Sequence, residues 1–193
     1  MLFARAPRAG RVKTRLAAEV GEEVALATYR SVGGLVAGQV AAQYPITIWY
    51  DPPDALDEMR GWLGDHEFLS QAGANLGARM AHAFETHFAR GDTPVIVIGA
   101  DAPGVGAATI EEAERALAEA DVVIGPALDG GYYLLGLNGP AAAIFDGVPW
   151  GSDGVFEVTV ALCRQCHLAV ELLEPLRDLD TAADLRALGL ERT

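Results

Sequence analysis

Segments of nearly continuous apolar residues alternate along the chain with longer segments in which apolar residues recur about every 3.6 positions. Short continuous runs are typical of strands buried on both faces of a parallel sheet, and the second pattern is typical of amphipathic helices. The pattern predicts strands over residues 1–4, 45–50, 66–70, 94–100, 121–125, 131–137 and 167–173. It predicts helices over residues 14–42, 54–63, 75–90, 107–120, 152–166 and 181–188.

Strands that alternate with helices along an unbroken chain indicate the α/β class. We therefore expect a three-layer α/β/α sandwich with a mostly parallel sheet, formed by residues 1–193 as a single domain. The chain is 51% hydrophobic, which is ample for a buried core. Asp54 is suited to be the N-cap of the helix over 54–63, and Gly189 is placed to end the last helix.

The net charge of −13 argues against a nucleic-acid or anionic-membrane surface, because the general field would repel both. No apolar run approaches the roughly 20 residues that span a bilayer, and residues 1–7 do not form a secretory signal. Two cysteines do not make a disulfide framework, so we expect a cytoplasmic protein. The apolar composition permits a homodimer without requiring one.

Basic residues gather at the start of this acidic chain. Residues 1–15 carry five positive charges and no acid, and they include the only lysine, Lys13. Lysine offers a compact, mobile point charge, whereas arginine offers a planar fork. Gly10 permits a ligand to approach the backbone, and amides at the start of the following helix would face an anion. The loop predicts a phosphate site with Lys13 and Arg15; a solvated basic turn is the alternative.

Carboxylates follow two of the predicted buried strands. Asp101 follows the strand over 94–100, and Asp129 follows the strand over 121–125. Ligands of parallel α/β sheets lie beyond the carboxyl ends of the strands, so we expect the basic loop, Asp101 and Asp129 at one edge. A carboxylate there suits a divalent cation such as Mg²⁺ or a ribose contact; a helix cap is the alternative for Asp101.

Three further segments could either bind a ligand or have a purely structural role. Asp178 and Asp180 could supply a second metal carboxylate, or this segment could cap the last helix through Thr181 and Asp184. Gly73 and Gly77 could receive a base or sugar, or could belong to a loop capped by Asn75. The turn from Asp129 to Gly131 could bind hydroxyls, or could be an ordinary Asp-Gly turn.

The chain resembles a family of bacterial GT-A-type nucleotide-diphospho-sugar transferases, some of them named for arsenosugar biosynthesis. The matching stretches run in order over nearly the whole chain: residues 3–16, 76–80, 99–103, 129–137, 148–150 and 177–181. The wider superfamily is similar and includes 2-phospho-lactate guanylyltransferase and molybdenum-cofactor guanylyltransferase. The usual glycosyltransferase Asp-x-Asp reads Asp101-Ala102-Pro103 here, which makes Asp180 more important for metal binding.

The resemblance implies a metal-assisted transferase that moves a glycosyl group from a nucleotide-sugar to a small acceptor. The catalytic candidates are Lys13, Asp101 and Asp129, and the ligands for Mg²⁺ or Mn²⁺ are Asp101 and Asp180. The expected nucleotide or phosphate contacts are Ala4, Pro7, Gly10, Lys13, Arg15, Gly73, Leu76, Gly77 and Arg79. The expected substrate contacts are Asp129, Gly130, Gly131, Tyr132 and Trp150.

Two alternatives stay open at this stage. Nucleotidyl transfer from a nucleoside triphosphate would use the same residues and release pyrophosphate. A non-catalytic nucleotide-binding module would bind tightly without turnover.

Overall fold

The computed structural model describes residues 1–190, which fold into two compact units. Unit 1 contains Met1, Gln71–Ile98 and Ala108–Leu176; unit 2 contains Leu2–Ser70, Gly99–Ala107 and the described residues from Arg177 on. Each unit is built from segments that are far apart in the sequence. The expectation that the chain forms a single domain stays a prediction.

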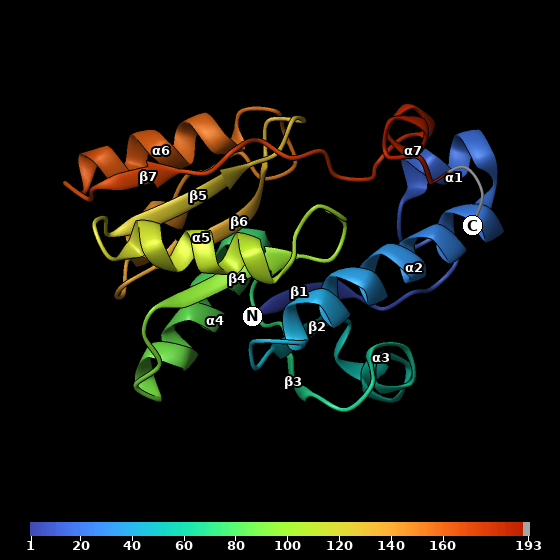
Figure 1. Cartoon of the computed structure of the whole chain (residues 1–193), viewed down its shortest axis with the longest axis horizontal. Helices are drawn as coiled ribbons and strands as arrows, with labels where there is room; N and C mark the ends of the chain where they lie inside the picture. Colours follow the sequence, from blue (N-terminus) through green and yellow to red (C-terminus); the bar gives the residue numbers. More distant parts are fainter. Residues whose placement is uncertain (191–193) are drawn as a thin grey trace. The chain divides into compact units, whose positions relative to one another are not determined.

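Unit 2 holds three parallel strands: β1 (Leu2–Arg5), β2 (Thr47–Asp51) and β3 (Glu67–Ser70), in the order β3-β2-β1 (Figure 1). Its helices are α1 (Thr14–Val20), α2 (Glu22–Ala41), the 3₁₀ turn η1 (Pro53–Ala55), α3 (Leu56–Leu63) and α7 (Ala182–Ala187). Helix α1 packs against α2 and α7, and α2 packs against α3. Trp62 of α3 lies over Gly33 of α2 and donates a hydrogen bond to the Arg30 carbonyl at 2.9 Å.

Unit 1 is built on β4 (Val95–Gly99, up to Ile98), β5 (Val122–Pro126), β6 (Tyr132–Leu137) and β7 (Val170–Leu172), in the order β4-β6-β5-β7. Strand β6 is antiparallel to β4 and β5, whereas β5 and β7 are parallel. The unit also contains α4 (Leu76–Ala89), most of α5 (Ala107–Leu117), the 3₁₀ turn η2 (Ala142–Phe145) and α6 (Val155–Gln165).

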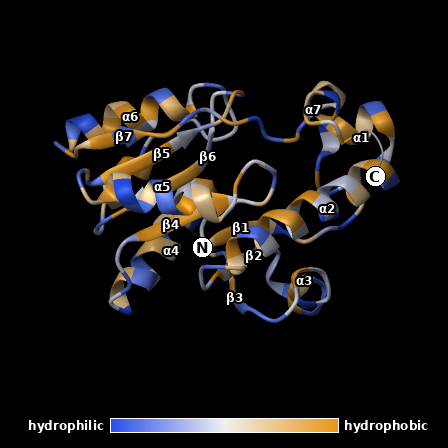
Figure 2. Cartoon of the chain, in the orientation of Figure 1, coloured by the Kyte–Doolittle hydropathy of each residue, from blue (hydrophilic) through white to orange (hydrophobic). Residues whose placement is uncertain are grey.

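Both units have apolar interiors to which their strands contribute fully buried residues. Leu2 and Ile48 are fully buried in unit 2, and Ile124, Leu134 and Leu135 are fully buried in unit 1. Figure 2 shows β4 and β5 as largely hydrophobic, while α5 and α6 carry hydrophilic residues as well. Burying a side chain of this size contributes about 1.5–3 kcal/mol, so these strand residues stabilise their units.

The predicted elements are all present, and two local predictions are wrong. The helical stretch over 14–42 is two helices, because Gly21 breaks it with a φ of 90°. Asp54 does not cap a helix: it lies inside η1 and pairs with Arg8, and α3 begins after Ala55 without a side-chain cap. The 3₁₀ turn η1 begins at a proline, whose fixed φ suits the first position of a helix.

Three local interpretations are confirmed. Asn75 caps α4 by accepting a hydrogen bond from the Ala78 amide, and Thr181 and Asp184 form a capping box on α7. Gly189 follows the last helix in the left-handed conformation, with a φ of 68°. Over residues 1–190, no helix is both long and apolar enough to cross a membrane.

Candidate functional site

The loop between β1 and α1 ends at Lys13 in an unusual backbone conformation. Arg8 and Arg11 donate backbone hydrogen bonds to Ala6 and Arg8, and Gly10 turns the chain with a φ of 68°. Lys13 follows in the left-handed region, with φ 46° and ψ 47°, and its carbonyl accepts the first hydrogen bond of α1. For a residue with a Cβ, this conformation costs about 1–2 kcal/mol. It sets the direction in which the Lys13 side chain leaves the loop.

The Lys13 ammonium lies between two carboxylates. Its Nζ is 2.8 Å from Oδ2 of Asp101 and 3.7 Å from Oδ1 of Asp180, and the lysine side chain is only 8% exposed. The Arg15 guanidinium pairs with the other oxygen of Asp180. All four residues belong to unit 2, although 88 residues separate Lys13 from Asp101 in the sequence and 165 separate Arg15 from Asp180. We call these four residues the Lys13 cluster.

The neighbouring carboxylates stabilise the protonated form of Lys13. Burial alone would lower the pKa of Lys13, but the hydrogen bond and attraction of Asp101, with the charges of Asp180 and Asp178, hold it above its usual value. The side chain is therefore an ammonium ion at neutral pH. The charges of Lys13 and Arg15 balance those of the two aspartates within the Lys13 cluster.

Backbone contacts hold the two aspartates near each other. Leu179, which is fully buried, donates its amide to the Asp101 carbonyl at 2.9 Å. Because Leu179 precedes Asp180, this bond fastens the C-terminal segment beside the Asp101 turn. Gly99 lets the Asp101 side chain fold back, since a Cβ there would lie 2.8 Å from Oδ1 of Asp101.

Helix α7 adds a second constraint on the same segment. Asp184 accepts hydrogen bonds from the amide and hydroxyl of Thr181 at 2.9 and 2.7 Å, and it pairs with Arg177 at 2.8 Å. Burial opposes ionisation of Asp184, but these hydrogen bonds outweigh it and lower the carboxyl pKa. The side chain of Glu19 in α1 accepts from the Ala182 amide at 3.3 Å. Hydrogen bonds thus fix the chain both before Asp180, at Leu179, and after it, at the start of α7.

The first arginines of the basic loop have other partners. Arg5 pairs with Asp51 at 3.4 Å. Arg8 donates hydrogen bonds to the Glu58 carboxylate through two nitrogens and also forms an ion pair with Asp54. These pairs join the loop to β2, η1 and α3. The positive charge of residues 1–15 is therefore partly neutralised by acids of the same unit, and Lys13 and Arg15 are paired with acids as well, within the Lys13 cluster.

The other predicted residues of this loop are placed as follows. Ala4 lies on β1 and is buried, Pro7 is buried in the loop, and Gly10 turns the loop with Glu22 3.3 Å from the place of its missing Cβ. Their predicted contacts with a nucleotide remain predictions.

The chemistry of the donors fits a divalent cation at the Lys13 cluster. Within residues 1–190 there is no group of three or more His, Cys, Asp or Glu side chains arranged to hold a metal ion. Mg²⁺ in nucleotide enzymes is bound by one or two carboxylates together with substrate phosphates and water. Asp101 and Asp180 are two carboxylates that already face one cation, so they match this smaller requirement.

The predicted site residues around Gly73 and Gly77 belong to unit 1, where protein contacts account for both glycines. A Cβ on Gly73 would lie 2.7 Å from the Arg79 amide, and Arg79 itself braces this loop by bonding to the Gly73 carbonyl at 3.3 Å. A Cβ on Gly77 would lie 2.5 Å from Nε1 of Trp150. Leu76, at the start of α4, is 46% exposed.

The turn at Asp129 is also in unit 1 and is ordered by its own backbone. Oδ1 of Asp129 accepts from the Gly131 amide at 2.9 Å, which is the plain Asp-Gly turn. Gly130, with a φ of 92°, leaves no room for a Cβ beside the Asp153 carbonyl, and its own carbonyl accepts from Phe156 at 2.9 Å. Gly130 thus allows the loop that precedes α6 to pack closely against this turn.

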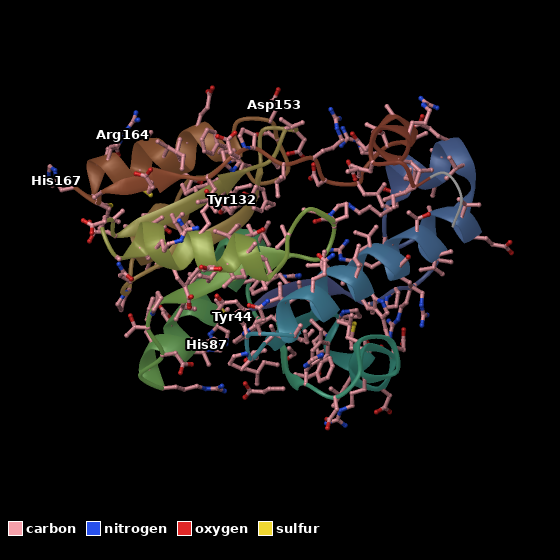
Figure 3. All side chains as sticks on the ribbon, in the orientation of Figure 1. Tyr44, His87, Tyr132, Asp153, Arg164 and His167 are labelled. Atoms are coloured by element: carbon pink, nitrogen blue, oxygen red, sulfur yellow. The ribbon has the colours of Figure 1, made fainter. Side chains whose placement is uncertain are left out.

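Tyr132 connects this turn with Trp150. The two rings meet edge to face, with centroids 6.5 Å apart and planes at 83°. Figure 3 places Tyr132 among the strands of unit 1 and Asp153 on the loop before α6. The structure therefore brings Tyr132, Trp150 and Gly77 together in one unit, as it brings Lys13, Arg15, Asp101 and Asp180 together in the other.

The sequence did not single out Leu179, and it did not indicate the contact between Trp150 and Gly77. Leu179 orients Asp180, and the signal for it was the alternation of a buried leucine with aspartates over residues 178–180. Trp150 accounts for Gly77, which no spacing in the sequence could indicate, because the two residues are joined only by the fold.

The chain is similar to a solved structure over nearly its whole length. The crystal structure of a protein provisionally described as a nucleotide-diphospho-sugar transferase, from Desulfovibrio desulfuricans G20, is 36% identical, with a TM-score of 0.92 over 97% of this chain and 84% of that one. The match shows the predicted three-layer α/β fold with a mostly parallel sheet and confirms the GT-A-type resemblance.

More distant structures share the fold alone. The 4-diphosphocytidyl-2C-methyl-D-erythritol synthase of Anaerococcus prevotii DSM 20548 is 11% identical, with a TM-score of 0.61 and coverage of 99% of this chain and 97% of that one. The Rv0371c protein of Mycobacterium tuberculosis H37Rv, in complex with manganese, is 16% identical, with a TM-score of 0.52 and coverage of 99% and 97%. No curated protein gives a significant match. The model of a family described as an uncharacterized protein conserved in bacteria (DUF2064) matches residues 35–152.

Proposed function

The chain belongs to the bacterial family DUF2064, and from that premise and the Lys13 cluster we propose that it is a transferase that binds a nucleotide-sugar and moves the glycosyl group to a small acceptor. The similarity to the Desulfovibrio protein supports the transferase class, since that protein is 36% identical and carries such a description. The Lys13 cluster supports the binding of a diphosphate.

The observation that carries this proposal is the buried, strained Lys13. A buried ion pair is weak evidence for stability, because desolvation offsets most of its attraction. The left-handed backbone at Lys13 adds a further cost of about 1–2 kcal/mol. Residues held in sparsely populated backbone regions cluster at active sites and ligand clamps. We therefore attribute the conformation to ligand binding: it keeps an ammonium ion ready beside two carboxylates.

The basic and acidic residues of the Lys13 cluster would have different roles. Lys13 and Arg15 would bind the oxygens of the donor diphosphate, and Asp101 and Asp180 would hold Mg²⁺ or Mn²⁺. Such a cation supplies charge stabilisation to the departing diphosphate. In the transfer, the bond from the anomeric carbon to the diphosphate oxygen breaks with its electron pair on oxygen. The acceptor oxygen forms the new bond to carbon and loses its proton, and Asp129 is our candidate for the base.

The test is the identity of the product. Purified protein is incubated with UDP-, GDP-, ADP- and dTDP-sugars, and separately with the four nucleoside triphosphates, in Mg²⁺ or Mn²⁺ with a pool of small hydroxyl acceptors. Glycosyl transfer releases a nucleoside diphosphate, and we expect Asp101→Asn to lower that rate by about a hundredfold or more. Full turnover of Asp101→Asn would contradict its metal role.

The same assay separates the alternatives. Release of pyrophosphate from a triphosphate would identify nucleotidyl transfer and overturn the glycosyl proposal. Nucleotide binding without any product in the whole panel would identify a binding module.

A further inference from the structure

The Lys13 ammonium and a divalent cation need the same two carboxylates. Asp101 and Asp180 both face Nζ of Lys13, at 2.8 and 3.7 Å, and the second oxygen of Asp180 is taken by Arg15. We propose that Lys13 competes with the metal for Asp101 and Asp180. In the free protein its ammonium pairs with both carboxylates, and it leaves them for the donor when an anionic donor binds. This inference rests on the function proposed above and adds to it the order in which ligands bind.

Local charge explains why the exchange needs an anion. Lys13 and Arg15 balance Asp101 and Asp180, and Asp178 adds one negative charge nearby, so a divalent cation alone would leave this part of unit 2 with a surplus positive charge. In a partly buried place such a surplus is strongly unfavourable. A diphosphate group brings compensating negative charge, and it also gives the displaced ammonium a new partner. Metal and donor are therefore expected to bind together and each to bind weakly alone.

The side chains differ in a way that allows this movement. Asp101 and Asp180 are 36% and 27% exposed, so solvent and ions reach them, whereas Lys13 is 8% exposed. Lysine has a flexible four-carbon stem that can carry its charge to another partner without a change in the backbone. The fixed parts of the cluster are the two aspartates, which the Leu179 amide and the α7 capping box hold in place.

The experiment measures binding of Mn²⁺ alone, through the loss of the electron paramagnetic resonance signal of the free ion. Lys13→Met removes the competing ammonium, so we expect it to bind Mn²⁺ roughly tenfold more tightly than the wild type. Asp101→Asn in the Lys13→Met background should abolish that gain. An affinity in Lys13→Met equal to or weaker than that of the wild type overturns the proposal.

Arg11→Met is the matched control for total charge. Arg11 is exposed on the same loop, and its side chain makes no ion pair within residues 1–190. This variant removes one positive charge, as Lys13→Met does, but leaves the carboxylate pair closed. We expect its Mn²⁺ affinity to stay within about twofold of the wild type. An equal gain in both variants would mean that general charge, rather than competition, sets the affinity, and would also overturn the proposal.

A second measurement needs no variant and therefore does not depend on whether Lys13→Met folds. Lys13 is the only lysine in the chain, so acylation by an amine-reactive ester, read by mass spectrometry, reports on this side chain apart from the N-terminus. With Mg²⁺ alone at high concentration, release of the ammonium should raise the rate of Lys13 acylation several-fold. An unchanged rate, with Mg²⁺ shown to bind by calorimetry, contradicts displacement.

Failure of this inference is distinguishable from failure of the proposed function. The Mn²⁺ and acylation measurements involve no sugar donor and no turnover, so they can succeed in a protein that transfers nothing. Conversely, glycosyl transfer with unaltered Mn²⁺ binding in Lys13→Met would retain the function and reject the competition.

Discussion

The left-handed backbone at Lys13 gives a prediction in which two substitutions at one position differ in a defined way. Lys13→Ala and Lys13→Gly both remove the ammonium that pairs with Asp101 and Asp180. Removing one partner of a fully buried pair costs about 3–5 kcal/mol, but these carboxylates are 36% and 27% exposed, so we expect about 1–3 kcal/mol for either variant.

The two variants should separate because only alanine retains a Cβ. The conformation with φ 46° costs a residue with a Cβ about 1–2 kcal/mol, whereas glycine adopts it freely. The larger conformational entropy of glycine in the unfolded chain destabilises the folded variant by about 0.5–1 kcal/mol and so offsets part of the relieved backbone strain. Lys13→Gly should therefore be more stable than Lys13→Ala by about 0.5–1 kcal/mol, which is about 1–4 °C in Tm for a chain of this length.

The assay is thermal unfolding in the presence of a chelator, so that metal binding does not contribute. Arg11 supplies the control, since it lies two residues earlier and is not among the residues with a positive φ. There the order should reverse, with Arg11→Ala at least as stable as Arg11→Gly. If Lys13→Gly is no more stable than Lys13→Ala, the backbone at Lys13 is not strained and our functional argument from that strain fails.

Two further predictions concern the supports of the sites. Gly77→Ala places a Cβ 2.5 Å from Nε1 of Trp150, so it should cost about 1–3 kcal/mol and shift the tryptophan fluorescence. Both variants are compared with the wild type by urea titration. Gly61→Ala, in the exposed part of α3 with nothing within 4 Å of the new Cβ, should be neutral or stabilising; equal losses in both variants would reject the Trp150 contact. Asp184→Asn should destabilise by about 1 kcal/mol at neutral pH, because it weakens the capping box and the pair with Arg177. The pKa of Asp184 is lowered in the folded chain, so its stabilisation is present above the usual value of 3.8 and is lost as the pH falls through the lower folded value. Urea unfolding at pH 7 and pH 3 should show the gap between wild type and variant shrinking at the lower pH, and a constant gap would exclude an ionic contribution.

Periodicity was enough to locate the strands and most of the helices, because the central strands bury short apolar runs and the longer helices bury one face. It was not enough where backbone geometry decides. The helical pattern over 14–42 gave no sign that Gly21 separates two helices, and the proline before Asp54 shifted the start of α3. The direction of β6 could not be inferred either, since buried parallel and antiparallel strands have the same composition.

The members of the Lys13 cluster could be anticipated from charge, because a single lysine in a basic loop, Asp101 after a buried strand and Asp180 near the C-terminal end indicate one kind of ligand. The pairing within it could not. The sequence suggested that Lys13 awaits a phosphate, whereas the structure shows its ammonium already engaged by Asp101 and Asp180. The alternative interpretation of the glycine positions also fits the packing: Gly77 accommodates Trp150, and Gly130 accommodates Asp153. Their contacts with a ligand stay predictions.

Binding of a nucleotide donor's phosphates by the Lys13 cluster can be measured with a thermal-shift panel. Wild type and Lys13→Ala are compared with UDP-, GDP-, ADP- and dTDP-sugars and the four nucleoside triphosphates, each with and without Mg²⁺ or Mn²⁺. At a hundredfold excess over Kd, binding stabilises the folded chain by about 2.7 kcal/mol, which raises Tm by several degrees. We expect a metal-dependent rise with at least one nucleotide-sugar that is absent in Lys13→Ala. No rise with any nucleotide, or an equal rise in Lys13→Ala, would contradict it.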